Sequence, residues 1–170
     1  AGTHVTAVGV TTLTGLAVAG VAAGVLGTLA MDLLNHLFAR NGMILRIDVG
    51  MIGRMAAGWA RGRFLYANPG ELIPVRNERL WGYATHYAIG VGLALPYVLG
   101  WNLFLGGPSS PLWALAYGVA TTAASWFFVY PSMGMGPCGR RSPDGFKAPL
   151  SSLANHVFYG VGLAVGIAVT

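Results

Sequence analysis

The chain has 170 residues, of which 55% are hydrophobic and only 9% are charged, whereas about a quarter of the residues in a soluble domain carry charge. This composition excludes a soluble globular domain and indicates an integral membrane protein. The net charge is +5, but all ten Lys and Arg residues fall in residues 40–79 and 140–147, which is the pattern of the positive-inside rule, so we expect the lipid bilayer and no nucleic acid as partner.

The first predicted span covers residues 13–38, which is longer than the about 20 apolar residues needed to cross about 30 Å of hydrocarbon. Its charged and ionisable groups, Asp32 and His36, are four residues apart near its end. Residues with this spacing share one face of a helix. We therefore expect a carboxylate and an imidazole side by side near the inner end of the span.

Residues 39–79 form a long basic connection that contains a short amphipathic pattern. One helical face is apolar and consists of Ile52, Met55, Ala56 and Trp59, and the opposite face consists of Arg54, Gly58 and Arg61. This pattern predicts a short interfacial helix in the headgroup region, anchored by Trp59 and Phe64, with Arg54, Trp59 and Arg61 as its interfacial residues. A helix packed under the bundle with its arginines in water has the same periodicity, so the sequence leaves both interpretations open.

Three further spans follow, at residues 80–101, 111–130 and 150–169, so residues 1–170 are predicted to form a single four-span domain. The uncharged connection 102–110 is expected outside, and the basic connection 132–149, with a glycine-rich re-entering turn, is expected in the cytoplasm. Both termini are then outside. The single cysteine, Cys138, excludes an intramolecular disulfide and lies on the reducing side.

Glycine pairs with helical spacing occur in the first and the last span. They are Gly20 with Gly24, and Gly162 with Gly166. Small residues four apart let a neighbouring membrane helix approach closely. The same spacing also arises by chance in a chain with 26 glycines.

A short sequence repeat links the second and fourth spans. The stretch His86-Tyr-Ala-Ile-Gly-Val-Gly-Leu-Ala94 returns as His156-Val-Phe-Tyr-Gly-Val-Gly-Leu-Ala164. If both runs cross the membrane in the same direction, the two imidazoles lie at the same depth. We therefore predict two parallel-repeat helical hairpins, related by a pseudo-twofold axis along the membrane normal that passes between His86 and His156.

Each repeated histidine lies about six residues, and so about 9 Å, inside its span. Ionisable side chains in hydrocarbon are costly unless they are paired, so these groups should face the bundle interior together with Asp32 and His36. Neutral imidazoles and a carboxylate suit Zn, Fe or Mn, and two imidazoles can hold a haem axially. The predicted metal ligands are Asp32, His36, His86 and His156, and the predicted cofactor-binding residues are His86 and His156.

The resulting functional hypothesis is a binding module for a transition metal or a haem-like cofactor. Three alternatives stay open. The polar layer can fix helix registry alone, the chain can be an accessory or assembly subunit of a larger membrane complex, or the same groups can serve a proton-coupled small-molecule carrier. We find no Ser/His/Asp triad and no redox cysteine pair, so the sequence does not decide whether the protein is an enzyme.

Several short motifs occur in a characteristic order. They are Met31-Asp32, Gly53-Arg54, Gly62-Arg63-Phe64, His86-Tyr87 with Gly90, Gly100-Trp101, Pro131 with Gly134 and Gly136, Ser142-Pro143, and His156 with Gly160, Gly162 and Leu163. In this order and spacing the chain resembles domain of unknown function 2938, a family of short bacterial inner-membrane proteins. The resemblance implies four spans and the importance of Asp32, Arg54, His86 and His156, but it implies no activity.

Overall fold

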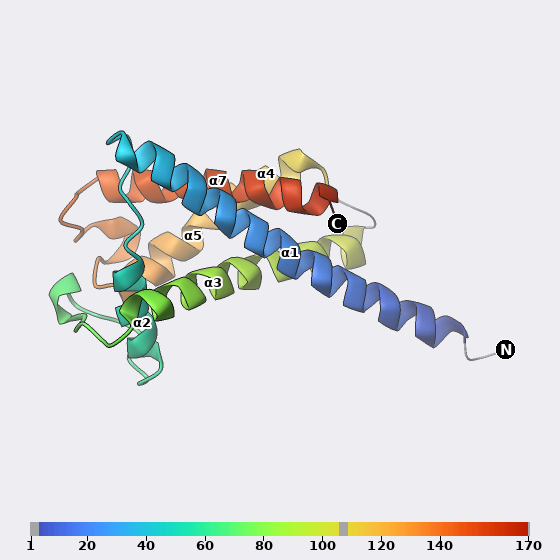
Figure 1. The fold of residues 1–170 in the computed structure, drawn as a ribbon, viewed down its shortest axis with the longest axis horizontal. Coiled ribbons are helices and arrows are strands. Elements are labelled where there is room, and N and C mark those ends of the chain that lie inside the picture. The colour runs from blue at the N-terminus through green and yellow to red at the C-terminus, as the bar shows by residue number, and fades with distance from the viewer. Residues whose placement is uncertain (1–3, 106–108, 170) are drawn as a thin grey trace.

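The computed structural model describes residues 4–105 and 109–169, with side chains described from residue 13 onward. Every regular element within these residues is helical. Figure 1 shows long helices running side by side, with one short helix crossing an end of the bundle. The long helices are α1 (His4–Arg40), α3 (Glu78–Gly100) and α7 (Lys147–Val169), and the short one is α2 (Val49–Trp59).

Four helical segments are long and apolar enough to cross a membrane. They are Leu13–Arg40, Glu78–Leu105, Pro111–Ser132 and Lys147–Val169. The prediction of four spans is therefore confirmed. The helices run a few residues beyond the predicted bounds because charged end residues such as Arg40 and Lys147 continue the helix while their side chains are exposed.

The second and third spans each contain a π-helical turn, which the sequence did not predict. In the second span, α3 continues into the π-helix Trp101–Leu105. The third span is built from α4 (Pro111–Ala120), α5 (Thr122–Ala124), the π-helix Ser125–Val129 and α6 (Tyr130–Ser132). Such π-helical turns often occur at functional sites. Residues 106–108 of the expected outer connection lie outside the described residues.

Helix α1 is the central element, because it packs against both α3 and α7, while α4 packs against the other side of α7. Close approach depends on glycine. A Cβ atom on Gly24 would lie 2.6 Å from Cα of Val91 in α3, and a Cβ on Gly166 would lie 2.6 Å from Cα of Ala23 in α1. The predicted close packing at glycines of the first and last spans is confirmed.

The two helical hairpins do not pack symmetrically. A two-fold axis that relates α1 to α4 and α3 to α7 would match every α1–α7 contact with an α3–α4 contact. The structure has an extensive α1–α7 interface, and α3 and α4 form no comparable interface among the described residues. The predicted two-fold arrangement of the hairpins is therefore not confirmed.

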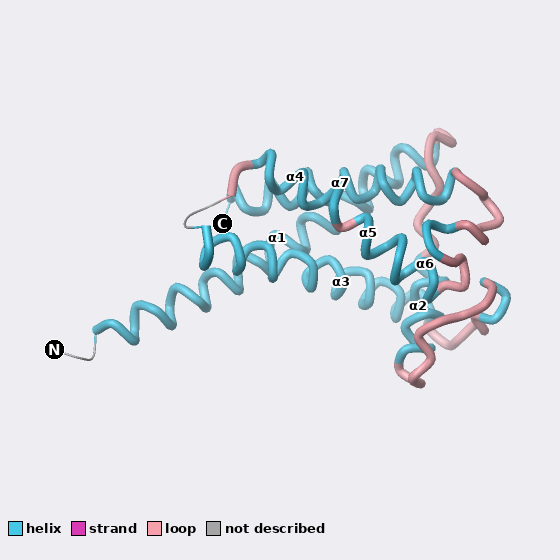
Figure 2. The backbone as a smooth tube through the Cα atoms, turned by 180° about the vertical axis from the view of Figure 1, so that it is seen from behind, coloured by secondary structure: helices cyan, strands magenta, loops and turns pink. Residues whose placement is uncertain are grey.

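Helix α2 packs across the end of the bundle against the start of α3 (Figures 1 and 2). Gly53 of α2 contacts the Glu78 backbone, and Gly82 of α3 contacts the Val49 carbonyl, so that neither position has room for a Cβ. Met55 is fully buried. The apolar face therefore meets protein, as in the second of the two interpretations, and a location of α2 in the headgroup region is not confirmed.

The opposite face of α2 also differs from the prediction. Gly58, which was expected on the polar face, is buried against the Tyr66 hydroxyl. A glycine fits there because the chain turns back after α2 and brings Tyr66 against the helix. The polar side of α2 is therefore narrower than the periodicity indicates.

The two basic connections meet at the same end of the molecule. The Arg141 guanidinium donates to the Ala67 carbonyl at 2.9 Å, and the Lys147 ammonium donates to the Gly42 carbonyl at 3.1 Å. Figure 2 shows the long loops gathered at this end. The positive charge of the chain is thus concentrated at one end, which we call the basic end.

Candidate functional site

A cavity of about 440 Å³ lies inside the basic half of the bundle. Its wall is formed by α1, α2, α3, the third span and α7, and it includes both His86 and His156. At one side it reaches the exposed loop residues Pro143 and Asp144. The structure therefore brings the two repeated histidines to a single cavity, on helices that are separated by α1.

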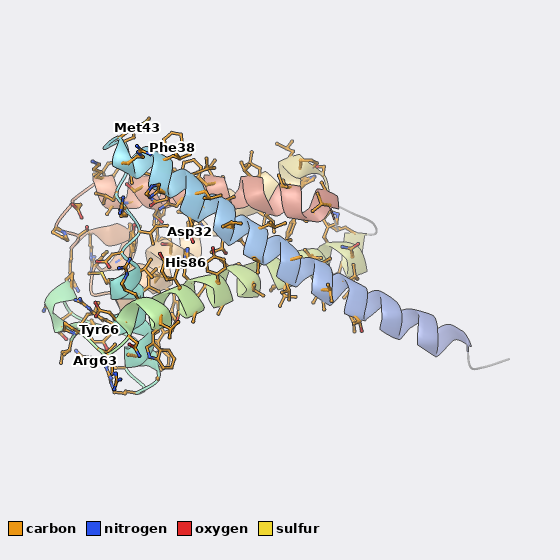
Figure 3. The ribbon with its side chains drawn as sticks, viewed as in Figure 1. Asp32, Phe38, Met43, Arg63, Tyr66 and His86 are labelled. Atoms are coloured by element: carbon orange, nitrogen blue, oxygen red, sulfur yellow. The ribbon has the colours of Figure 1, made fainter. Side chains whose placement is uncertain are left out.

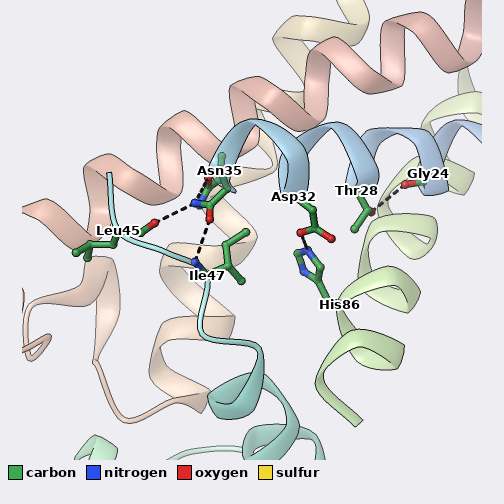
Figure 4. A network of polar contacts seen from close by, with 8 residues as sticks. Gly24, Thr28, Asp32, Asn35, Leu45, Ile47 and His86 are labelled. Atoms are coloured by element: carbon green, nitrogen blue, oxygen red, sulfur yellow. Dashed lines mark hydrogen bonds and ion pairs between the residues drawn. The ribbon is translucent and has the colours of Figure 1, made fainter. Parts of the chain in front are cut away.

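His86 is held by a carboxylate of the neighbouring helix. Its Nε2 lies 2.9 Å from Oδ1 of Asp32, and the side chains of His86 and Asp32 are 13% and 23% exposed. Figures 3 and 4 show the two side chains pointing toward one another between α1 and α3. Because a carboxylate accepts, Nε2 carries the proton, and in the neutral ring Nδ1 keeps a lone pair. Tyr87 meets the same ring edge-on, with 5.9 Å between ring centroids.

His156 is held by Thr121, which lies between α4 and α5. The Thr121 hydroxyl donates to the Gly118 carbonyl at 2.6 Å and lies 2.8 Å from Nδ1 of His156. A hydroxyl has one proton, so toward His156 it must accept, and Nδ1 carries the hydrogen. The neutral His156 ring then keeps a lone pair on Nε2. In both hairpins, the histidine on the second helix is oriented by a side chain on the first.

A second, more open hollow of about 620 Å³ lies on the other side of the Asp32–His86 pair. Asp32 lines this hollow, whereas His86 lines the central cavity, so the pair forms part of the wall between them. His36 is exposed and also lines the second hollow. The expected neighbours Asp32 and His36 therefore do share a side of α1, but His36 does not reach the cavity.

The four predicted metal ligands thus have three separate environments. Asp32 is bonded to His86, His156 is bonded to Thr121, and His36 faces outward. Across the described side chains, no three His, Cys, Asp or Glu residues are grouped so that they could hold a metal ion. This leaves the Zn, Fe or Mn site without support from the geometry.

Two buried asparagines near the site were not predicted. The Asn35 amide donates to Asn155 Oδ1 and to the Leu45 carbonyl, both at 2.9 Å, and its oxygen accepts from the Ile47 amide at 3.2 Å. Figure 4 shows this network fixing the extended segment after α1. Asn35 was visible as a polar residue in an apolar span, but a neutral amide suggests no chemistry. Its role is to position the segment that carries Arg46, which lines both the cavity and the second hollow.

Tyrosines link α3 to α7 and to α4 on the outer side of the cavity. The Tyr159 hydroxyl donates to the Gly90 carbonyl at 2.6 Å, and the Tyr117 hydroxyl donates to the Leu93 carbonyl at 2.7 Å. Tyr117 stacks on Tyr97 with 4.4 Å between ring centroids. These aromatic contacts close the gap between α3 and α4 beyond Leu93, so that the cavity lies in the basic half of the bundle.

The three residues predicted as interfacial have different environments. Arg54 forms a two-point ion pair with Glu78, with N–O distances of 2.7 and 3.0 Å. The hydrogen bond with Glu78 raises the pKa of Arg54 above its ordinary value, so the guanidinium is charged at every physiological pH. Trp59 packs on Phe128, with 5.4 Å between centroids, and Arg61 is exposed. The ion pair of Arg54 with Glu78 therefore holds α2 against α3.

The comparisons with known proteins identify a family and add no activity. No curated protein and no solved structure matches the chain. A family model described as "Protein of unknown function (DUF2938)" matches residues 21–170, which is most of the chain. With four apolar helices and this match over nearly its whole length, the chain belongs to the DUF2938 family of proteins of unknown function.

Proposed function

We propose that the protein is a membrane-embedded binding module that holds a small, mostly apolar ligand or cofactor in the central cavity, with His86 and His156 as the polar contacts. The observation that supports this proposal is that two imidazoles from separate helices line one cavity of about 440 Å³. Ligand pockets typically have volumes of about 300–1,000 Å³ and an apolar wall with a few convergent polar groups.

The hydrogen bonds of the two rings favour a ligand that carries a metal or a hydrogen-bond donor. Each imidazole is fixed at one nitrogen, by Asp32 or by Thr121, and the other nitrogen keeps its lone pair. Metal-bound histidines are typically oriented in this way by a second hydrogen bond. A haem-like cofactor with a metal between two imidazoles is therefore the finer form of the proposal.

The proposed location is the bacterial inner membrane, with the basic end in the cytoplasm and both termini outside. The proposal is supported by the concentration of Lys and Arg at one end of the bundle, which matches the positive-inside rule. In this orientation α2 crosses the bundle near the headgroups of the inner leaflet, with Arg61 exposed beside it.

The test is to identify what the purified protein retains. Native mass spectrometry, a visible spectrum and metal analysis of protein in detergent should reveal a bound species, and His86→Gln and His156→Gln should each reduce its occupancy. Ser152→Phe should displace it, because Ser152 lies on the cavity wall. Val161→Phe, on the exposed side of the same helix, is the matched control and should leave occupancy unchanged. A bound species that survives Ser152→Phe in a folded protein would refute the proposal.

A proton-coupled carrier is the second candidate, because one observation favours it. The Asp32–His86 hydrogen bond lies between the open hollow and the central cavity. A proton taken up from the cavity at Nδ1 of His86 would let Nε2 give its proton to Asp32 at the hollow, so that a proton passes without crossing hydrocarbon. Uptake experiments in proteoliposomes should then show proton movement that Asp32→Asn abolishes. The role of an accessory subunit stays a prediction from the sequence.

A further inference from the structure

The methionines of this chain are concentrated on the cavity wall. The chain has six methionines, and five of them line the cavity: Met31, Met51, Met55, Met133 and Met135. The sixth, Met43, is 63% exposed and does not line it. Methionine is an adaptable filler of apolar cores, but filling alone gives no reason for this type of side chain to gather at one cavity.

Four of these methionines belong to one apolar cluster although they come from two distant segments. Met51 and Met55 lie one turn apart on α2. Met133 and Met135 flank Gly134, whose φ of +76° turns the chain so that both side chains reach the same cluster as Met55. Met55 is 0% and Met133 is 6% exposed. The methionine cluster, defined as these four residues, therefore has two buried thioethers and two partly buried ones at the basic end of the cavity.

The inner wall of the cavity offers soft, neutral donors, and its charged lining residues, Arg46, Asp48 and Asp144, lie on the loops. Thioether sulfur and neutral imidazole nitrogen are the ligands that favour Cu(I), whereas Mg, Ca and Mn prefer carboxylate, carbonyl and water oxygen. The solvation cost of burying an ion rises with the square of its charge, so the low-dielectric wall of thioethers and imidazoles favours a monovalent ion. Of the carboxylates on the loop side, Asp48 caps α2 through the Met51 amide, and Asp144 is exposed. This agrees with the absence, among the described side chains, of a His/Cys/Asp/Glu group suited to a metal ion.

We propose that the cavity binds a soft monovalent metal ion, Cu(I), through the methionine cluster, with His86 and His156 as nitrogen ligands deeper on the same wall. This inference rests on the proposed function, because both require the cavity to be a ligand site, and it goes beyond it by naming a metal ion as ligand in place of an apolar cofactor. The methionine cluster lies toward the basic end, where Asp144 and Pro143 are exposed, so the ion would meet thioethers first on entering from that side.

The experiment measures Cu(I) binding to the full chain in detergent, without oxygen, against a chromogenic Cu(I) chelator. Cys138→Ser is the background, because a thiol binds Cu(I) by itself. We expect this background to bind Cu(I), and also the redox-inert ion Ag(I). Met55→Leu with Met133→Leu should weaken binding by about tenfold or more, as loss of ligand contacts does in other metal sites. Met43→Leu is the matched control and should bind as the background does.

Leucine has nearly the volume of methionine, so the fold should tolerate these changes. If this double variant unfolds, the variant Met51→Leu with Met135→Leu takes its place, because these two residues are only partly buried. Independently, X-ray absorption of the copper-loaded background protein should show sulfur atoms bound to the copper. Three results would each overturn the inference: the background protein binds no Cu(I), the folded double variant binds Cu(I) as tightly as the background does, or the bound copper lacks sulfur neighbours. If another species is found that Ser152→Phe displaces, the proposed function survives the loss of the copper inference, and if the cavity holds no ligand of any kind, both fail.

Discussion

At the scale of single residues, the cavity depends on polar side chains that hydrogen-bond across neighbouring helices. Asp32 has a carboxylate in a membrane span, and its partner there is the His86 ring at 2.9 Å. A charged group inside a membrane protein is tolerated when it is paired or reached by water. Asp32 meets both conditions, because it is bonded to His86 and also lines the open hollow. This explains how a carboxylate is tolerated in the span.

Asp32→Asn keeps the size of the side chain but removes its charge. Because hydrogen bonds to charged groups contribute about 1.5–3 kcal/mol and neutral ones about 0.5–1.5 kcal/mol, we expect the free energy of unfolding to fall by about 1–2 kcal/mol. The measurement is a double-mutant cycle with His86→Gln, in which the unfolding free energy of each variant is obtained by SDS titration in mixed micelles. Additive effects of the two substitutions would contradict a direct Asp32–His86 interaction.

Tyr159→Phe tests the hydrogen bond that ties α7 to α3. The Tyr159 side chain is 1% exposed, and its hydroxyl donates to the Gly90 carbonyl at 2.6 Å. Removing the hydroxyl should lower the free energy of unfolding by about 0.5–1.5 kcal/mol. Tyr83→Phe, at a side chain that is 45% exposed, is the control and should change stability little. Equal effects at the two positions would show that Tyr159 contributes through its ring alone.

Residue-scale features were predicted unevenly. The two repeated histidines and Asp32 could be found because ionisable groups are rare in apolar spans. Thr121 and Asn35 could not, because neutral hydroxyl and amide groups are common in membrane helices and only the fold shows which of them are buried against a partner. The pairing of His86 with Asp32 also required the packing of α1 on α3, which composition does not specify.

At the scale of elements, glycine determines how closely the helices approach. Gly82 lies where α2 crosses α3, and a Cβ there would overlap the Val49 carbonyl. Gly92 lies on the same helix, and a Cβ there would meet nothing within 4 Å. Both positions are glycine and so have the same helix propensity, and they differ only in whether a neighbouring helix packs against them.

Gly82→Ala should therefore destabilise the docking of α2, whereas Gly92→Ala should stabilise the protein by about 0.5–1 kcal/mol because alanine is the better helix former. Backbone contacts at Gly82 cannot move aside without shifting α2, so we expect Gly82→Ala to expose the helix to limited proteolysis near Arg61. Thermal unfolding and proteolysis of both variants are the measurements. A more stable Gly82→Ala variant would show that α2 is not held as the structure has it.

The apolar face of α2 illustrates why elements are easier to predict than their surroundings. The period of Ile52, Met55 and Trp59 predicted a short helix with one apolar face, and the structure has that helix. The same spacing of apolar residues occurs on a helix face that meets lipid and on one that meets protein, because both environments exclude water. Only the glycines Gly53 and Gly82 indicate a protein neighbour, and in a chain with 26 glycines they do not stand out.

At the scale of the whole molecule, four spans and two basic loops predict an orientation that Cys138 can test. Cys138 is the only cysteine of the chain and lies in a basic loop at the basic end. With the basic end in the cytoplasm, a membrane-impermeant maleimide should not label it in intact cells but should label it in inverted vesicles. Cys138→Ser with Leu112→Cys, at the other end of the bundle, should show the reverse. Labelling of Cys138 in intact cells would contradict the proposed orientation and place the basic end outside.

The number of spans and the gathering of the basic loops could be predicted from hydropathy and charge, because both follow from burial of chain segments in lipid. The arrangement of the helices around α1 could not, because the repeat suggested symmetry while the glycine contacts favour one particular partner for each helix. The cavity between α3 and α7 follows from this asymmetry.

The stacked rings of Tyr97 and Tyr117 limit the paths by which a molecule bound in the cavity can leave. Because these rings stack between α3 and α4 on the outer side of Leu93, a bound molecule reaches a dead end there. It must leave through the half of the membrane from which it entered, unless that stack opens. A carrier built on this fold would therefore have to separate the two rings on every transport cycle.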